Sequence, residues 1–462
     1  MEQTMNQNKM GTRPIPGLLV SMSLPPMISM LIQSLYNIVD SMFVARYSED
    51  AFTAVSLAFP LQNFILAVAV GTGVGLNSYI ARKLGEGRRE DANNAVVHGL
   101  LLSLVSGLLF VALGAAVIPP FFSLFTEESA VLDYAYSYSY IVVFFAFGQQ
   151  VHIAVEKVFQ ATGKMLFPMV FQAVGAILNI ILDPIMIFGL FGFPAMGVAG
   201  AAAATVIGQM VAMLLSLLAL FCFKQEVKAD FRRFHLDLRM VKDIYVVGLP
   251  SMLMNSLGSV LVMGLNAILV RFSNEAVSAF GLYFKLQTFV YMPVSGLIQG
   301  TMPIMGFNYG ARQRERLMQA FRLALGITAA IMLLGNLLFL LWPDGLLYLF
   351  NAEGKLLELG RDALRIISCG FLPASLGFII ATLFQAMGRG ASSLVIFLLR
   401  QFAITLPAAF LLAIPLGLTG VWLAFPLAEC IAAAVSLVLY SVVRRRDPVL
   451  SGAGSELQEA AR

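Results

Sequence analysis

Acidic and amide side chains stand inside long apolar stretches of this 462-residue chain. Asp40 lies in the middle of LYNIVDSMFVARY, and Asp183 lies in LNIILDPIMIFG, one helical turn after Asn179. A third acid, Glu156, closes another apolar stretch and precedes Lys157. The neutral form of a carboxyl group is favoured away from water, and acids at membrane depth commonly mark ion pathways or proton relays. These residue types therefore point to the binding and release of a proton or a small cation.

Polar neighbours accompany two of these acids at helical spacing. Positions 33, 36, 37 and 40 follow the pattern i, i+3, i+4, i+7 and so share one helix face. Pro184 follows Asp183 and has no N–H, which leaves a carbonyl free one turn earlier, and such oxygens suit a proton or a hard cation. The predicted coupling site, with Na⁺ possible at its first three members, is Asp40, Asn179, Asp183, Asn37, Gln33, Tyr36 and Thr205. A purely structural role, as paired or hydrogen-bonded acids that fix helix packing, stays open for each acid.

The composition indicates a membrane protein. Only 12% of the residues are charged and 59% are apolar, whereas soluble domains carry about 25% charged residues. Apolar spans of roughly 18 residues or more, long enough to cross a hydrocarbon core of about 30 Å, recur from end to end. We predict an all-α polytopic protein with twelve spans at about 16–45, 51–80, 93–119, 131–156, 166–190, 196–223, 241–270, 277–308, 316–342, 357–387, 393–416 and 419–443.

Lysine and arginine collect in alternate connections between these spans. The basic connections are 81–90, 156–164, 223–242, 310–316 and 444–447. Positive charge gathers on the cytoplasmic side, which predicts that both termini are cytoplasmic. The polar first 13 residues show no cleavage site, so we expect the first span to remain in the product. The expected location is the cell (inner) membrane.

The two halves of the sequence repeat each other. LPPM at 24–27 matches LPSM at 249–252, and FQATGK at 159–164 matches FQAMGR at 384–389, both 225 residues apart. Further on, GVAGAAAA matches GLTGVWLA at a shorter offset. Two parallel six-helix repeats with a cleft between them are typical of secondary transporters. The predicted parts are an N-terminal lobe with the cation site (1–223), a cytoplasmic linker (224–242), a C-terminal lobe (243–447) and a cytoplasmic tail (448–462).

The halves differ in their charges. At the places equivalent to Asp40, Glu156 and Asp183, the second half has apolar residues. This asymmetry favours a specific task for the acids of the first half. For the charges of the second half, Lys285, Arg400 and Glu429, pairing is the favoured interpretation. Adaptable aromatic and thioether side chains suit varied lipophilic ligands, so the predicted substrate-binding residues are Asp183, Glu156, Tyr283 and Met292; for the last two, ordinary packing is the alternative.

Other chemistries have little support in the sequence. Three histidines are scattered without metal-ligand spacing, no nucleophile motif stands out, and three cysteines lie in or beside apolar spans. We therefore expect neither an enzyme nor a cofactor, no resident metal and no nucleic-acid partner.

The residues also resemble a known family over nearly the whole chain. SLPPMISMLIQSLYNIVDSMFVARY, GTGVGLNSYIARKLGEGRREDA, EKVFQATGK and LNIILDPIMIFG are together similar to the multidrug and toxic compound extrusion (MATE) family, in its bacterial MepA-type branch. The resemblance implies two six-helix lobes arranged in a V, with the cation site at Asp40, Asn179 and Asp183 and with Glu156 involved in substrate handling. It implies export of varied, often cationic compounds, such as drugs, in exchange for inward H⁺ or Na⁺.

Acids that bind Na⁺ in the C-terminal lobe of some relatives are missing from the interiors of spans 7, 8 and 10 here, which favours protons and an N-lobe site. We expect a monomer in the lipid bilayer. A lipid or polysaccharide-precursor flippase of the wider MOP type is the alternative function, although its pyrophosphate cargo would require a cationic cleft rather than an acidic first lobe.

Overall fold

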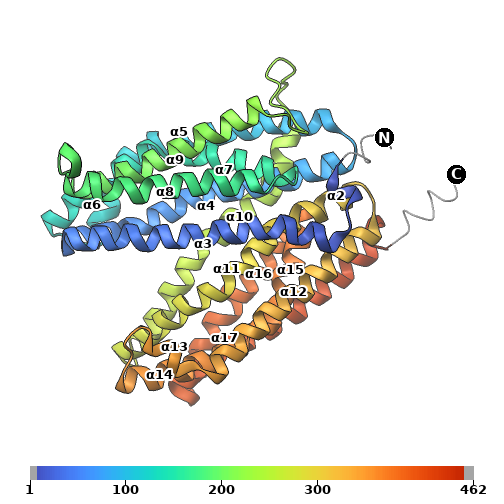
Figure 1. Ribbon diagram of the computed structural model, residues 1–462. Helices are drawn as coiled ribbons and strands as arrows, with labels where there is room; N and C mark the ends of the chain where they lie inside the picture. Colours follow the sequence, from blue (N-terminus) through green and yellow to red (C-terminus); the bar gives the residue numbers. More distant parts are fainter. Residues whose placement is uncertain (1–7, 452–462) are drawn as a thin grey trace, which may run out of the picture. The chain divides into compact units, whose positions relative to one another are not determined.

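The computed structural model describes residues 8–451, and every regular element in this range is a helix (Figure 1). The first half contains α2 (Lys9–Thr12), α3 (Ile15–Tyr47), α4 (Glu49–Gly85), α5 (Arg89–Ser123), α6 (Ser129–Phe144), α7 (Ala146–Ala161), α8 (Leu166–Phe188), the 3₁₀ turn η1 (Leu190–Gly192) and α9 (Val198–Cys222). The second half contains α10 (Leu238–Leu269), α11 (Asn274–Gly310), α12 (Arg314–Leu341), α13 (Pro343–Tyr348), α14 (Gly354–Ser368), α15 (Phe371–Ala386), α16 (Gly390–Leu398), the π-helical turn η2 (Leu399–Ile404), α17 (Thr405–Arg446) and α18 (Pro448–Ser451). The predicted all-α fold is confirmed.

The helices account for the predicted membrane spans. Within the described range, eight helical segments are long and apolar enough to cross a membrane, and two bent pairs, α6 with α7 and α14 with α15, bring the number to ten. One of the eight runs for 57 residues, from Gly390 to Arg446, and its helical path breaks at Gly417, between two predicted spans. The remaining prediction, 277–308, falls on the 37-residue α11. The chain is a multi-pass membrane protein.

The backbone repeats where the sequence does. Gly197, which precedes α9, has φ 56° and ψ −129°, and its counterpart Gly417 has φ 60° and ψ −139°. This region of backbone space is strained for any residue with a Cβ atom, so only glycine fits it well. Each half also closes the helix that ends in its FQA motif with the same bond, from Lys164 N to Phe159 O at 2.9 Å and from Arg389 N to its equivalent carbonyl at 2.7 Å. These features support the predicted duplication.

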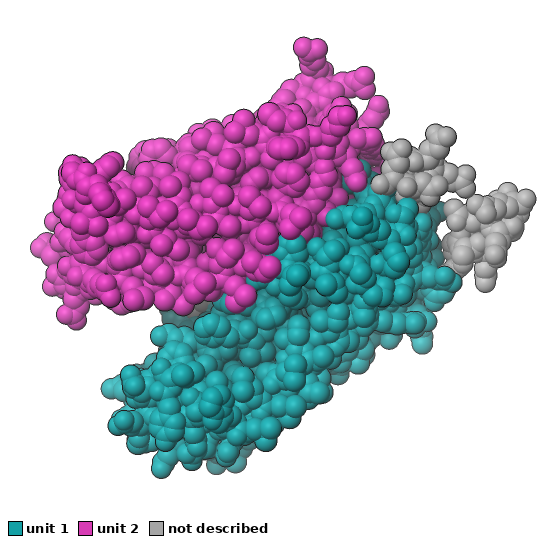
Figure 2. Space-filling view, viewed as in Figure 1, with its two compact units in different colours: residues 1–27, 84–87, 256–462 teal, residues 28–83, 88–255 magenta. Residues whose placement is uncertain are grey.

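The chain forms two compact units, which Figure 2 colours separately. Unit 1 comprises residues up to 27, residues 84–87 and residues from 256 onward, and unit 2 comprises residues 28–83 and 88–255. The first helix of each repeat is therefore divided, α3 after Met27 and α10 after Asn255, shortly beyond its prolines. Proline removes one helical hydrogen bond and so supplies a natural point of division. The lobe boundaries drawn from the sequence stay a prediction.

Each unit has its own apolar core. In unit 2, Phe122 and Tyr138 are buried among small residues of α4, α6 and α9. In unit 1, Phe280 packs against Trp422 with ring centroids 6.4 Å apart. Small residues allow helices to approach closely in a membrane, where packing rather than the hydrophobic effect joins them.

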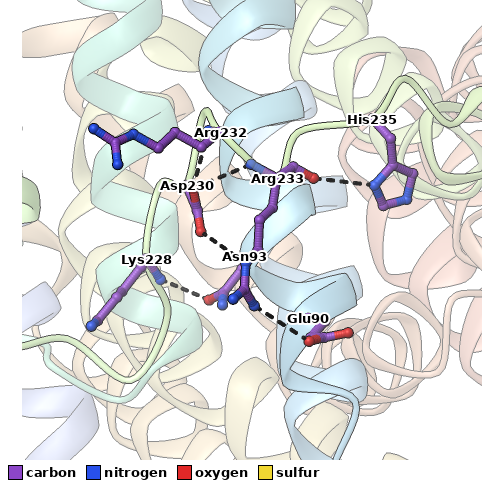
Figure 3. A network of polar contacts seen from close by, with 7 residues as sticks. All are labelled: Glu90, Asn93, Lys228, Asp230, Arg232, Arg233 and His235. Atoms are coloured by element: carbon purple, nitrogen blue, oxygen red, sulfur yellow. Dashed lines mark hydrogen bonds and ion pairs between the residues drawn. The ribbon is translucent and has the colours of Figure 1, made fainter.

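The segment between the two repeats lies against α5 within unit 2 (Figure 3). The Lys228 N–H donates to Asn93 Oδ1 at 2.7 Å. The next residue of α5, Asn94, donates from its side chain to the His235 carbonyl at 3.0 Å. These bonds fasten the predicted linker to one unit, so it is not a free tether between the two.

Candidate functional site

The predicted coupling residues of unit 2 are positioned by a close approach of α8 and α9. A Cβ atom on Gly175 would lie 3.0 Å from the Gly208 carbonyl oxygen, and one on Gly208 would lie 2.7 Å from the Gly175 oxygen. The missing side chains thus let the two backbones touch. Asn179 and Thr205, one turn away on either helix, are thereby brought face to face.

Asn179 is the centre of the resulting hydrogen-bond network. Its side-chain nitrogen lies 3.2 Å from Asp183 Oδ1 and 3.3 Å from Thr205 Oγ1. Thr205 also hydrogen-bonds to the Tyr36 hydroxyl of α3. Asp183 is completely buried and Asn179 is 2% exposed, so the network is withdrawn from the surface. Three helices, α3, α8 and α9, therefore hold these polar groups in place.

Asp40 completes the cluster from α3. Its carboxyl group is half-buried and lies within range of direct interaction with that of Asp183. Three buried oxygens of the cluster have no hydrogen-bond partner: Asp40 Oδ1, Asn179 Oδ1 and Asp183 Oδ2. Buried polar atoms are nearly always paired, so such a gathering requires an explanation. Two ionised carboxylates repel each other, and a proton or a cation between them removes that repulsion.

The other residues predicted for this site lie further along α3. Gln33 Oε1 accepts a hydrogen bond from the Gln172 side chain of α8 at 3.2 Å. Asn37 is exposed, and its carbonyl accepts from the Ser41 hydroxyl. Gln33 therefore ties α3 to α8, while Asn37 presents a polar side chain that no described contact connects to the acids.

Tyr138 and its hydrogen-bond partner Gln62 were not identified from the sequence as part of this site. Tyr138 of α6 interacts electrostatically with Asp40 and Tyr36. Its hydroxyl accepts a hydrogen bond from the Gln62 side chain of α4 at 2.5 Å. Tyr138 belongs to a run of alternating tyrosines, AYSYSY, which gives no indication of which ring faces inward. Only the helix packing identifies it.

Glu156 lies in a separate network on α7. Its Oε1 accepts from Lys157 Nζ at 3.1 Å and from Gln160 Nε2 at 2.7 Å. The Lys157 stem packs against Gly73 of α4, and the ammonium also donates to Gln160 Oε1 at 3.0 Å. Among the described residues, no contact joins Glu156 to Asp183, so the structure places the two predicted substrate acids in different networks.

The remaining predicted contacts belong to unit 1. Tyr283 is 1% exposed and packs edge-on against Phe339, whereas Met292 is half-buried. Nearby, Arg400 and Glu429 form a buried ion pair with nitrogen and oxygen 2.6 Å apart. Arg400 sits in the π-helical η2, and its guanidinium lies 4.1 Å from the Phe378 ring centre. Two of the charges noted in the second half are thus paired.

Residues 8–451 hold no group of three His, Cys, Asp or Glu side chains placed to bind a metal ion. The cluster of α3, α8 and α9 instead offers two carboxylates and an amide. Hard oxygen ligands of this kind suit a proton or an alkali cation as a transported species.

The family model of MatE matches the chain twice, over residues 25–185 and 250–411, which together exceed half of its length. The chain belongs to the MatE family. MatE proteins are transporters and not enzymes, and they move small molecules across membranes, as the sequence predicted. The two matches each cover one half, which confirms the internal repeat.

Individual relatives of this MatE protein differ in what they carry. An FAD transporter of Shewanella oneidensis is 29% identical over 90% of this chain and 92% of its own length. The multidrug export protein MepA of Staphylococcus haemolyticus is 25% identical over 92% of this chain and 93% of its own. The solved structure of a MOP superfamily transporter from Pyrococcus furiosus has a TM-score of 0.88, with 28% identity over 97% of this chain and 98% of that one.

Proposed function

We propose that this protein exports lipophilic, often cationic small molecules in exchange for inward H⁺ (or Na⁺). The observation that carries the proposal is the cluster of Asp40, Asn179 and Asp183, with its three unpartnered buried oxygens. A buried pair of acids binds positive charge well, whether that charge is a proton, a sodium ion or a drug. The similarity to multidrug export proteins agrees with such cargo.

Exchange follows from competition for the same acids. When Asp40 and Asp183 are both ionised, unit 2 carries uncompensated negative charge that attracts an organic cation. When a proton enters the pair, that attraction weakens and the cation is released. A ligand shifts a two-state equilibrium only as far as its affinities for the two states differ, and here the difference is one unit of buried charge.

The residues around the pair have supporting tasks in this mechanism. Asn179 and Thr205 orient Asp183, Tyr36 extends the network to α3, and Gln33 ties that helix to α8. Asn37 supplies an exposed polar side chain on the same helix as Asp40. Glu156 would contact substrate from its own network. Tyr283 and Met292 of unit 1 stay predicted substrate contacts.

The preferred ion is the proton. An alkali-ion site is expected to gather five or six oxygens, as hard cations do, whereas two carboxyl groups suffice for a proton. We further propose cytoplasmic termini, a location in the cell (inner) membrane and a monomer as the working state. The distribution of arginine and lysine supports the orientation.

The proposal is tested by ethidium transport in proteoliposomes under an imposed pH gradient, first without and then with sodium. The wild type should need only the pH gradient. Asp183→Asn should abolish this transport, whereas the matched control Asp133→Asn, at an exposed position of α6, should retain it. Sodium-driven transport would reassign the same residues to Na⁺, and normal transport by Asp183→Asn would refute the proposal.

A second candidate cargo is a flavin nucleotide, because an FAD transporter is among the relatives. The same vesicles loaded with FAD test it directly through flavin fluorescence. Transport of FAD in preference to ethidium would show that the cargo is a flavin nucleotide and not an organic cation. FAD also carries an anionic pyrophosphate, so its transport should not depend on attraction to Asp40 and Asp183.

A further inference from the structure

A hollow of about 690 Å³ lies on unit 1, where α12 begins and α17 ends. It is lined by Arg314, Glu315, Met318, Gln319, Phe321, Arg322, Leu323, Tyr440 and Arg444. The coupling cluster belongs to unit 2, so this hollow is a separate site.

Positive charge dominates the rim. Arg314, Arg322 and Arg444 outnumber the single acid Glu315. Within residues 8–451, the side chains of Arg322 and Arg444 make no hydrogen bond or ion pair, and both are exposed. Two adjacent arginines, Arg445 and Arg446, continue the charge to the end of α17. Such a concentration attracts an anion that can be held by several guanidinium groups at once.

Apolar and aromatic side chains also line the hollow. The rings of Phe321 and Tyr440 stack with an interplanar angle of 6° and centroids 5.5 Å apart. A second hollow of about 260 Å³ on α17 is lined by Leu437, Val438, Ser441, Val442 and Arg445. Val438 is 61% exposed, and Leu437 and Val442 are also exposed on this membrane-spanning helix. An apolar surface of this kind faces acyl chains, so the arginines lie at the end of a lipid-facing stripe.

One arginine is fixed in place by α18. Arg314 Nε donates to the Leu450 carbonyl of α18 at 3.0 Å. That short helix is capped by the buried Asp447, whose Oδ1 accepts from the Leu450 N–H. Asp447 Oδ2 in turn accepts from Tyr309 and Arg389, at 2.9 and 3.0 Å. Arg314 is therefore held in place before a ligand binds, which favours binding because less ordering is required.

We propose that this hollow binds an anionic phospholipid of the cytoplasmic leaflet, its phosphate among Arg314, Arg322 and Arg444 and its acyl chains along Val438 and Leu437. The chemistry is that of basic pockets between membrane helices, which receive acidic head groups on the side where arginine collects. A phosphate carrying two acyl chains satisfies both halves of the surface, whereas a free phosphate satisfies only the rim.

Native mass spectrometry of the detergent-purified protein tests the proposal. The probes are palmitoyl-oleoyl phosphatidylglycerol and phosphatidylcholine with the same chains, added in equal amounts. The wild type should retain phosphatidylglycerol preferentially, and Arg322→Gln/Arg444→Gln should lower that preference by about thirtyfold, since the two basic residues near a lipid surface contribute roughly 1 kcal/mol each. The matched control, Arg232→Gln/Arg239→Gln, removes two arginines of the linker in unit 2 and should leave the preference intact.

Two further arms separate the lipid from its head group. Dihexanoyl phosphatidylglycerol has the same head group with short chains, and inorganic phosphate has none. Retention of the long-chain lipid alone supports a lipid site, whereas equal competition by inorganic phosphate would show a simple phosphate site and overturn the proposal. Equal retention of phosphatidylcholine, or an unchanged preference in the hollow variant, would overturn it as well. All four arginines are on the surface, so we expect both double variants to fold. Size-exclusion profiles of the purified variants check this.

Discussion

Removal of the Glu156 carboxylate separates a structural role from a role in substrate handling. Lys157 is only 6% exposed, and Glu156 is its counter-ion at 3.1 Å. A buried charge deprived of its partner destabilises a protein by about 3–5 kcal/mol. Gln160 Oε1 still accepts from the ammonium at 3.0 Å, so we expect Glu156→Gln to fall below this range, at about 2–3 kcal/mol. For units of this size, that lowers the melting temperature by about 4–12 °C.

The assay is thermal unfolding of purified protein followed by intrinsic fluorescence, paired with drug transport per folded molecule. Glu156→Gln/Lys157→Met removes both charges, and replacing a buried pair by apolar groups is often nearly neutral. The double variant should therefore recover at least half of the lost stability. If Glu156 also contacts substrate, the recovered protein will still transport drug poorly.

Two results would refute this reasoning. Additive destabilisation in the double variant would show that Glu156 and Lys157 do not depend on each other. Normal transport by a stable double variant would show that Glu156 acts only as the partner of Lys157. Glu156 would then no longer count among the proposed substrate-binding residues.

Three other substitutions have defined outcomes. Thr205→Val removes the hydroxyl that joins α9 to α3 and α8 and should slow ion-driven transport by about tenfold, whereas Thr205→Ser should not; equal rates would contradict the network. Glu429→Gln leaves the Arg400 guanidinium buried and should destabilise unit 1 by about 3–5 kcal/mol, measured by thermal unfolding, with recovery in Glu429→Leu/Arg400→Met. Gly417→Ala should destabilise by about 1–3 kcal/mol through backbone strain alone, because its Cβ would meet nothing closer than 4.0 Å; Gly281→Ala, at an open helical position, should not.

The sequence predicted the architecture well because membrane spans and repeats leave local signals. Apolar length defined the spans, and even the break inside the 57-residue segment fell at Gly417, where the sequence placed it. Where the chain divides into compact units could not be predicted. Residues up to Met27 group with the second half of the chain, and the part of α10 up to Asn255 groups with the first half. This division depends on packing between segments that are distant in the sequence.

The part of the site that lies on a single helix could be predicted from the spacing of its residues. Asn179 and Asp183, one turn apart, form the expected bond. The roles of Thr205 and Tyr138 depend on which faces of α9 and α6 turn toward α8 and α3, and amino-acid spacing within one helix does not carry that information. Lys157 was visible beside Glu156, but its burial against Gly73 requires the tertiary structure.

The central claim is that a proton and an organic cation compete for Asp40 and Asp183. The most direct test measures protons released when tetraphenylphosphonium binds to the purified protein in weakly buffered detergent solution. The account predicts release by the wild type and none by Asp40→Asn/Asp183→Asn. Cation binding to the wild type without release of a proton or a sodium ion, or undiminished release by the double variant, would contradict it.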